Sequence, residues 1–416
     1  MSSIRKNLLQ FVFTGAFMKR WNDKLRPTEF LEVDKQAHKM LAAWVLYELN
    51  AASLTQEERV HLGVKIIEGG LFDYFYRLII TDIKPPVFYQ IKNNPEHYRR
   101  LSDWVLQQLA PRVQPLGEAF QERLTAWVRN NGEGHPDLAA CILDAAHLYA
   151  SHWEFCLLKN INPLDDELQE IDTSFKNGLA SHSNLIGMPE LIEGVDSVLG
   201  RFVHLCGQLR FQIRWSQTPR IPETSVLGHM FIVACYSYFV SLALEACSVR
   251  LANNFFAGLV HDLPELLTRD IISPVKRSVA YLSDLIKEYE KKELERRVFN
   301  PLTMGGYSGL VSRLAYFLGI EVGNEFAETI IEDNCVRHIN FSELCTNYNE
   351  NRFNPKDGET LKICDVLAAF VEVYTALRNG ISSDQLQQAL WLMRRKYQQV
   401  SLGQAVHVGA LLADFD

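Results

Sequence analysis

Apolar residues recur at three- and four-residue spacings through most of this chain, and this periodicity limits the possible folds more than any other feature. Six segments carry the pattern: residues 36–49, 101–109, 136–159, 224–247, 279–298 and 361–378. Alternating apolar runs bounded by hairpin signals are scarce. We therefore predict an all-α fold.

The chain is long enough for two domains of ordinary size. It has 416 residues, and either half could bury a hydrophobic core unaided. Residues 160–188 are polar and irregular, with proline, glycines and an acidic run, so we predict a linker there. We place one domain at residues 1–185 and the other at residues 186–416.

The two halves repeat several landmarks in the same order. The pairs are Arg20-Trp21 with Arg214-Trp215, His38 with His229, Gly70 with Gly258, and Asp144 with Asp365. Their separations are 194, 191, 188 and 221 residues, which are nearly constant over the first three pairs. Four landmarks in one order predict a tandem duplication, and hence two tandem helical bundles.

The adjacent pair His261-Asp262 marks the segment with the clearest chemical potential. Neutral imidazole and carboxylate are ligands that suit a borderline divalent metal. His229 and Asp365 lie on apolar helical segments and add one ligand of each kind. Taken singly, each would more often be an ordinary core or helix residue, but the combination favours metal binding. We predict that these four residues hold one divalent ion, whose identity among Mn, Co, Zn, Fe, Ni and Mg the sequence does not resolve.

Two imidazoles and two carboxylates leave coordination positions open on a metal with five or six ligands. A water in such a position has its pKa lowered from 15.7 towards about 7. Glu265 lies three residues beyond Asp262, so we expect it nearby as general base or acid, although Pro264 interrupts that turn. Asp270 is a candidate to orient the water or a substrate hydroxyl. Lys276 is a candidate phosphate contact, with an exposed lysine as the ordinary alternative.

The first half differs where this chemistry would lie. Asp73-Tyr74 stands at the position of His261-Asp262, and Arg77 stands at that of Glu265. One imidazole fewer, and a cation in place of an acid, should weaken divalent-metal binding strongly. We therefore predict that the first half is a degenerate and catalytically inactive copy.

The second half resembles the HD-domain metal-dependent phosphohydrolases, which are named for a His, His-Asp, Asp ligand set. It is most similar to the bacterial 5′-deoxynucleotidases over residues 195–380, and the most specific part runs from His261 to Lys276. The resemblance implies an all-α fold, one metal on the four ligands, and phosphate-ester hydrolysis with Glu265 and Asp270. One departure is Gly228, where an acidic residue usually precedes the first histidine.

The resemblance also bears on substrate and assembly. It implies that Arg214 and Trp215 lie where that family holds the phosphate and sugar of a nucleotide. A tryptophan against C2′ would select deoxyribose over ribose by steric exclusion. The family forms dimers, so a homodimer is expected unless the internal pair of halves takes its place.

These observations favour removal of phosphate from (deoxy)nucleoside 5′-monophosphates by a metal-activated water. The alternatives are another HD phosphohydrolase activity, on a nucleoside triphosphate, a cyclic nucleotide or a nucleic-acid phosphoester, or a non-catalytic nucleotide-sensing protein. No glycine-rich phosphate loop points to a triphosphate.

The composition indicates a soluble cytoplasmic protein. Lys plus Arg is 42 against 50 Asp plus Glu, so no overall field attracts nucleic acid or an anionic membrane. The eight cysteines include no CxxC pair, which fits reduced core thiols. No signal peptide is evident, and the apolar stretch 230–244 falls short of a membrane span. We expect the partner to be a small-molecule phosphate ester, namely a nucleotide, and expect neither a membrane nor a nucleic acid.

Overall fold

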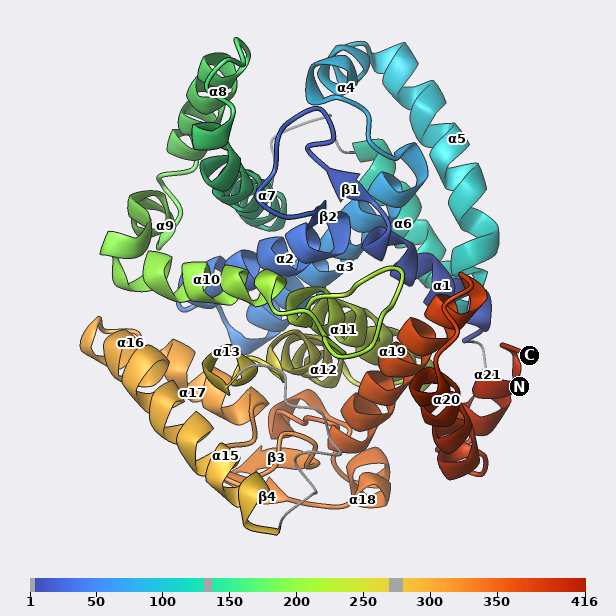
Figure 1. The fold of residues 1–416 in the computed structure, drawn as a ribbon. Coiled ribbons are helices and arrows are strands. Elements are labelled where there is room, and N and C mark those ends of the chain that lie inside the picture. Colours follow the sequence, from blue (N-terminus) through green and yellow to red (C-terminus); the bar gives the residue numbers. More distant parts are fainter. Residues whose placement is uncertain (1–3, 131–136, 269–279) are drawn as a thin grey trace.

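The structure is a computed structural model that describes residues 4–130, 137–268 and 280–416 (Figure 1). It confirms the predicted all-α fold. Within the described residues the strands form three short antiparallel pairs: β1 (Lys19–Arg20) with β2 (Phe30–Leu31), β3 (Thr329–Glu332) with β4 (Cys335–His338), and β5 (Ser401–Leu402) with β6 (Val406–His407).

All six predicted helices are present, with ends shifted by a few residues. The first part of the chain contains α1 (Lys6–Phe13), α2 (Glu32–Asn50), α3 (Gln56–Ile80), α4 (Pro85–Lys92), α5 (Pro95–Val113), α6 (Glu118–Asn130), α7 (Leu138–Leu158), α8 (Leu168–Ala180) and α9 (Met188–Glu193). The second part contains α10 (Val198–Gln208), α11 (Val226–Ala243), α12 (Ser248–Val260), α13 (Glu265–Thr268), α15 (Ala280–Leu294), α16 (Asn300–Met304), α17 (Ser308–Phe317), α18 (Phe341–Thr346), α19 (Gly358–Arg378), α20 (Asp384–Tyr397) and α21 (Val408–Ala413).

Helices α2 and α11 pack against each other at the centre of the molecule (Figure 1). Among the described residues, α11 is the one helix long and apolar enough to cross a membrane, so the expectation that this run is too short was wrong. However, 89% of this helix is buried inside the protein. Helix α11 therefore has the burial of a core helix in a soluble protein.

The two halves share one hydrophobic core. Helix α1 packs on α11 and α19, whereas α10 packs on α2, so each half covers the central helix of the other. Tyr236 Oη donates to the carbonyl of Leu9 at 2.8 Å, and Arg210 pairs with the buried carboxylate of Glu154 at 2.8 Å. The division between residues 185 and 186 stays a prediction.

The same backbone geometry occurs at the start of both central helices. The amide of Glu32 donates to the carbonyl of Met18 at 2.9 Å, and that of Val226 donates to Gln212 at 2.8 Å. Both pairs are 14 residues apart, and the second is displaced from the first by 194 residues. This separation aligns α2 with α11 directly.

Trp21 and Trp215 follow the same alignment, since both have φ of 56°. A tryptophan in the left-handed region is strained, so an identical outlier on both sides is a specific match. The separation of 194 residues places Lys35, and not His38, at the position of His229. The expected match of His38 was therefore wrong, because His38 turns to α10, where its Nε2 lies 3.0 Å from the carbonyl oxygen of Val203.

Helices α3 and α12 also match each other, because each approaches the preceding central helix closely at a glycine. A Cβ on Gly70 would lie 2.3 Å from Met40 Sδ, and one on Gly258 would lie 2.9 Å from Ala234 Cα. Positions 40 and 234 are again separated by 194 residues, and the two glycines by 188. This contact supports the expected correspondence of residues 73 and 261.

Two local predictions were wrong. The supposed linker at residues 160–188 contains α8, whose Leu168, Ile171 and Phe175 recur at helical spacing and pack against the small core around Phe155. A hairpin was also missed at β3 and β4. Its turn is the dipeptide 333–334, in which Asp333 and Asn334 have φ of 52° and 61°, as a tight two-residue hairpin requires.

Candidate metal centre

His229 lies one turn inside α11 and is completely buried. The helix begins there because Ser225 caps it: the Ser225 hydroxyl accepts from the amide of Gly228 at 2.9 Å. Ser225 is held in turn by Asp34 of α2, whose Oδ1 accepts from its hydroxyl at 2.6 Å. The first half of the chain thus supports the start of the helix that carries His229.

His261 and Asp262 follow directly after the end of α12. The Nδ1 of His261 donates to the carbonyl of Gly258 at 2.8 Å, which leaves Nε2 as the nitrogen that faces the cluster. That Nε2 is buried without a hydrogen-bond partner and lies 3.2 Å from Asp262 Oδ2. A buried imidazole nitrogen that faces a carboxylate and has no other partner is what a metal ligand presents.

Asp365 completes the group from α19. Its Oδ1 lies 3.0 Å from His229 Nε2, and ligand atoms of His229, His261 and Asp262 lie within 4.8 Å of one another. The structure therefore brings together all four residues that the sequence singled out. The side chains of Asp262 and Asp365 are 20% and 30% exposed, so the group opens to solvent on its carboxylate side.

The electrostatics of this group call for a cation. Burial lowers the pKa of His261, but the carboxylate of Asp262 outweighs it and raises that pKa to about 9. Burial raises the pKa of Asp262, and the histidines and Arg214 reverse this and hold it well below its usual range. Converging imidazole nitrogens and carboxylates fit a divalent ion, which would replace the proton on His261.

Glu372 is a component of the site that the sequence analysis missed. It lies on α19 seven residues after Asp365, so the two side chains share a helix face. Its Oε1 lies 3.2 Å from His229 Nδ1, and its Oε2 accepts from Trp215 Nε1 at 3.0 Å. The helical spacing from Asp365 was the available signal. Gly228 stands where the family usually has an acidic residue before the first histidine. In this protein Glu372 supplies the carboxylate that contacts His229.

Arg214 and Trp215 lie beside the ligand group. Arg214 Nη1 donates to Asp262 Oδ2 at 3.3 Å, and burial lowers the pKa of Arg214 while Glu372 and Asp262 raise it above its ordinary value. Both residues line a cavity of about 490 Å³. The remaining lining comes from Ile213, Ser216, Gln217, Thr218, Pro219, Arg220 and Glu223.

Glu265 begins the short helix α13 and is 8% exposed. Its amide donates to the carbonyl of Asp262 at 3.0 Å, so a turn connects the two despite Pro264. Its carboxylate contributes to the raised pKa of Arg214, which places it in the same electrostatic environment. Asp270 and Lys276 lie outside the described residues.

The matching region of the first half contains different side chains. Lys35 Nζ, fully buried, lies 2.6 Å from His147 Nδ1. His147 thus takes the place beside α2 that Asp365 takes beside α11. The expected match of Asp144 with Asp365 was wrong, because Asp144 is exposed and contacts His182 at 3.0 Å.

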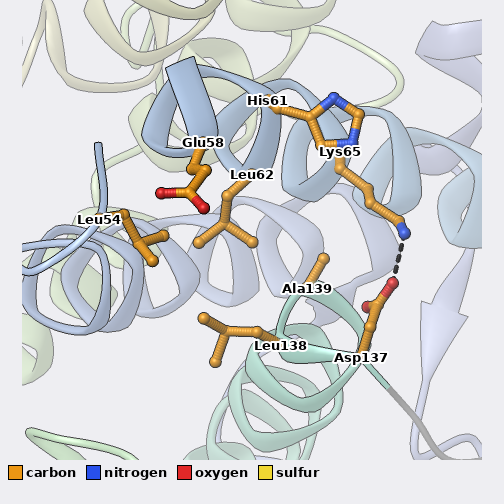
Figure 2. A pocket seen from close by; sticks show the side chains of 8 residues that line it. All are labelled: Leu54, Glu58, His61, Leu62, Lys65, Asp137, Leu138 and Ala139. Carbon is orange, nitrogen blue, oxygen red and sulfur yellow. Dashed lines mark hydrogen bonds and ion pairs between the residues drawn. The ribbon is translucent and has the colours of Figure 1, made fainter. Parts of the chain in front are cut away.

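A second cavity, of about 230 Å³, lies between α3 and the start of α7 (Figure 2). Lys65 and Asp137 form an ion pair at its edge, and Leu54, Leu62 and Leu138 supply apolar lining. Its charges are thus partly paired with each other. Within residues 4–130, 137–268 and 280–416, the one clustered set of three potential metal-binding His, Cys, Asp or Glu residues is that of His229, His261 and Asp262.

Comparison with known proteins places this site in a family. Residues 206–392 match a family model described as an HD domain. The match supports assignment of this part of the chain to the HD-domain superfamily. The match contains all four ligand residues and Glu372, and HD domains as a class are metal-dependent phosphohydrolases. Searches of curated proteins and of solved structures found no match.

Proposed function

We propose that this protein is a metal-dependent phosphohydrolase that removes phosphate from (deoxy)nucleoside 5′-monophosphates. One observation carries the proposal: four metal-ligating side chains converge beside a cavity lined by Arg214 and Trp215. A volume of about 490 Å³ lies within the range of small-molecule sites. The net charge of −8 argues against a nucleic-acid substrate.

His229, His261, Asp262 and Asp365 would hold one divalent ion. When bound, such an ion lowers the pKa of a coordinated water and polarises a phosphoryl oxygen. The histidines are suited to this role because each presents Nε2 to the group while Nδ1 contacts Glu372 or a carbonyl.

The remaining side chains have separate tasks in this mechanism. Glu265 would accept the proton of the attacking water as general base, or donate a proton to the leaving ester oxygen as general acid. Arg214 offers a planar guanidinium to the phosphate, and Trp215 packs against the sugar. Asp270 and Lys276 keep their predicted roles, orienting the water or a substrate hydroxyl and contacting the phosphate.

We also infer that the chain arose by tandem duplication and that its first half is inactive. The repeated tryptophan geometry and helix starts support this inference. Contacts of α1 with α11 and of α10 with α2 support the view that the internal pair takes the place of a homodimer. A cytoplasmic location is part of the proposal and is consistent with the buried apolar helix.

Phosphate release over a panel of nucleotides tests the activity. We expect turnover of deoxynucleoside 5′-monophosphates with Mn²⁺, Co²⁺ or Zn²⁺, and much weaker turnover of triphosphates and cyclic nucleotides. Glu265→Gln should lower kcat by about 10²- to 10⁴-fold with the metal still bound, because it removes only the proton-transfer group. Arg77→Gln, the counterpart change in the first half, should leave kcat unchanged.

Two outcomes would contradict this proposal. Nucleotide binding without phosphate release under any metal would favour a nucleotide-sensing protein. Preferred hydrolysis of a triphosphate, a cyclic nucleotide or a nucleic-acid end would keep the HD chemistry and replace the substrate.

A further inference from the structure

Glu372 contacts both the cluster of candidate metal ligands, through His229, and the cavity-lining loop at residues 213–223, through Trp215. Besides His229 on Oε1 and Trp215 on Oε2, it accepts from the hydroxyl of Thr224 at 3.0 Å. The guanidinium groups of Arg214 and Arg220 lie 3.6 Å and 3.8 Å from Oε2. The Glu372 side chain has no exposed surface, so these contacts are fixed inside the protein.

Glu372 acts as a hydrogen-bond acceptor in this environment. Its oxygens accept from Thr224 and Trp215 and face the guanidinium groups of Arg214 and Arg220. A carboxylate only accepts hydrogen bonds, so the proton of a neutral His229 must lie on Nδ1. The lone pair of Nε2 is then directed at Asp365 and Asp262, where the ion would bind.

We infer that Glu372 is a positioning residue that couples the two parts of the site. One oxygen fixes the tautomer of His229, and the other holds Trp215 in its left-handed backbone conformation at φ 56°. A residue in such a conformation persists only where its surroundings determine it. The inference rests on the proposed metal centre, and it predicts that metal affinity and substrate affinity depend on the same carboxylate.

The first half repeats one of these two tasks without the other. Trp21, also at φ 56°, donates from Nε1 to Glu154 Oε2 at 2.9 Å, and Arg20 pairs with the same oxygen at 2.8 Å. Lys35, at the position of His229, contacts His147 instead. Glu154 therefore holds a tryptophan without a metal ligand, which makes Glu154→Gln a matched control.

Zinc affinity of the full-length protein tests the inference, measured by competition with a chelator. Glutamine offers one acceptor where His229 and Trp215 need two, so Glu372→Gln should weaken zinc binding about 10- to 100-fold. The KM for the best nucleotide should rise even at saturating zinc. Glu372→Asp, which keeps the charge and both acceptors, should recover part of both losses. Glu154→Gln should leave zinc affinity unchanged while lowering Tm.

A measurement on the unaltered protein covers the case in which Glu372→Gln does not fold. With ¹⁵N-labelled histidine in the zinc-loaded protein, the ring proton of His229 should lie on Nδ1. A proton on Nε2, or zinc affinity unchanged in Glu372→Gln, would overturn the inference. Failure of the proposed function looks different: no nucleotide releases phosphate, while zinc affinity and the tautomer follow these expectations.

Discussion

Lys35 and His229 occupy the same position in the two central helices, and they meet the same electrostatic problem in opposite ways. Around His229, lone pairs and carboxylates converge and call for a cation from outside. Around Lys35, the chain supplies an amino group of its own, and Nζ lies 2.6 Å from His147 Nδ1. Burial lowers the pKa of Lys35 well below its ordinary value.

The arginine, tryptophan and glutamate that surround these two positions are nevertheless arranged alike, and together they form a common frame. Each half places an arginine and a strained tryptophan on one buried glutamate: Glu372 in the second half and Glu154 in the first. The difference teaches that this frame can persist as part of the fold while the ligands are replaced. One arrangement thus holds a candidate metal centre in the second half and a lysine–histidine contact in the first.

The largest expected effect comes from removing a ligand in the second half. His261→Ala should abolish stoichiometric metal binding and reduce phosphate release to background, because it removes one of the two imidazoles that face Asp262. Elemental analysis and a phosphate assay check this. Asp73→Asn, at the position of His261 in the first half, should keep both. Loss of metal in Asp73→Asn would break the comparison.

An intermediate effect is expected at the paired arginines. Arg214→Lys keeps the charge but loses the planar fork, so KM should rise about tenfold or more with a smaller change in Tm. Arg20 instead pairs with Glu154 and Glu32 at 2.8 Å and 2.7 Å, both buried. Arg20→Lys should therefore lower Tm and leave KM unchanged. Steady-state kinetics and thermal unfolding separate the two, and equal KM effects would contradict distinct roles.

The smallest effect concerns the contact between the halves. Asp34 matches Gly228 in position, and a Cβ on Gly228 would lie 2.6 Å from Asp34 Oδ1, so the packing leaves room for one side chain. Burial raises the pKa of Asp34 from 3.8 to about 6, with Arg210 and Ser225 opposing it. The folded protein then binds this proton more tightly than the unfolded chain, and stability falls as pH rises from about 4 to 6.

Asp34→Asn removes this titration while an amide oxygen can still accept from Ser225. The free energy of unfolding of the variant should match that of the wild type near pH 4. It should exceed the wild-type value by about 2 kcal/mol at pH 8, because each unit by which the pKa is raised is worth about 1.4 kcal/mol. Denaturant unfolding across that pH range checks the prediction. A difference independent of pH would show that Asp34 does not titrate in this range.

The sequence predicted the helices and the convergence of the four candidate ligands because both leave local signals. Apolar spacing revealed each long helix, and His261-Asp262 drew attention to His229 and Asp365. Glu372 was missed since a glutamate between two valines gives no sign of burial until its contacts are known. His38 and Asp144 were matched wrongly for a related reason, since residue identity was followed where only the backbone alignment places Lys35 and His147 correctly.

Anomalous scattering from crystals grown with Mn²⁺ or Zn²⁺ tests the central claim most directly. The account predicts one ion per chain, bound by the Nε2 atoms of His229 and His261 and by the carboxylates of Asp262 and Asp365, with no ion near Lys35. An ion beside Lys35 and His147, or full metal loading with these four side chains uninvolved, would contradict it.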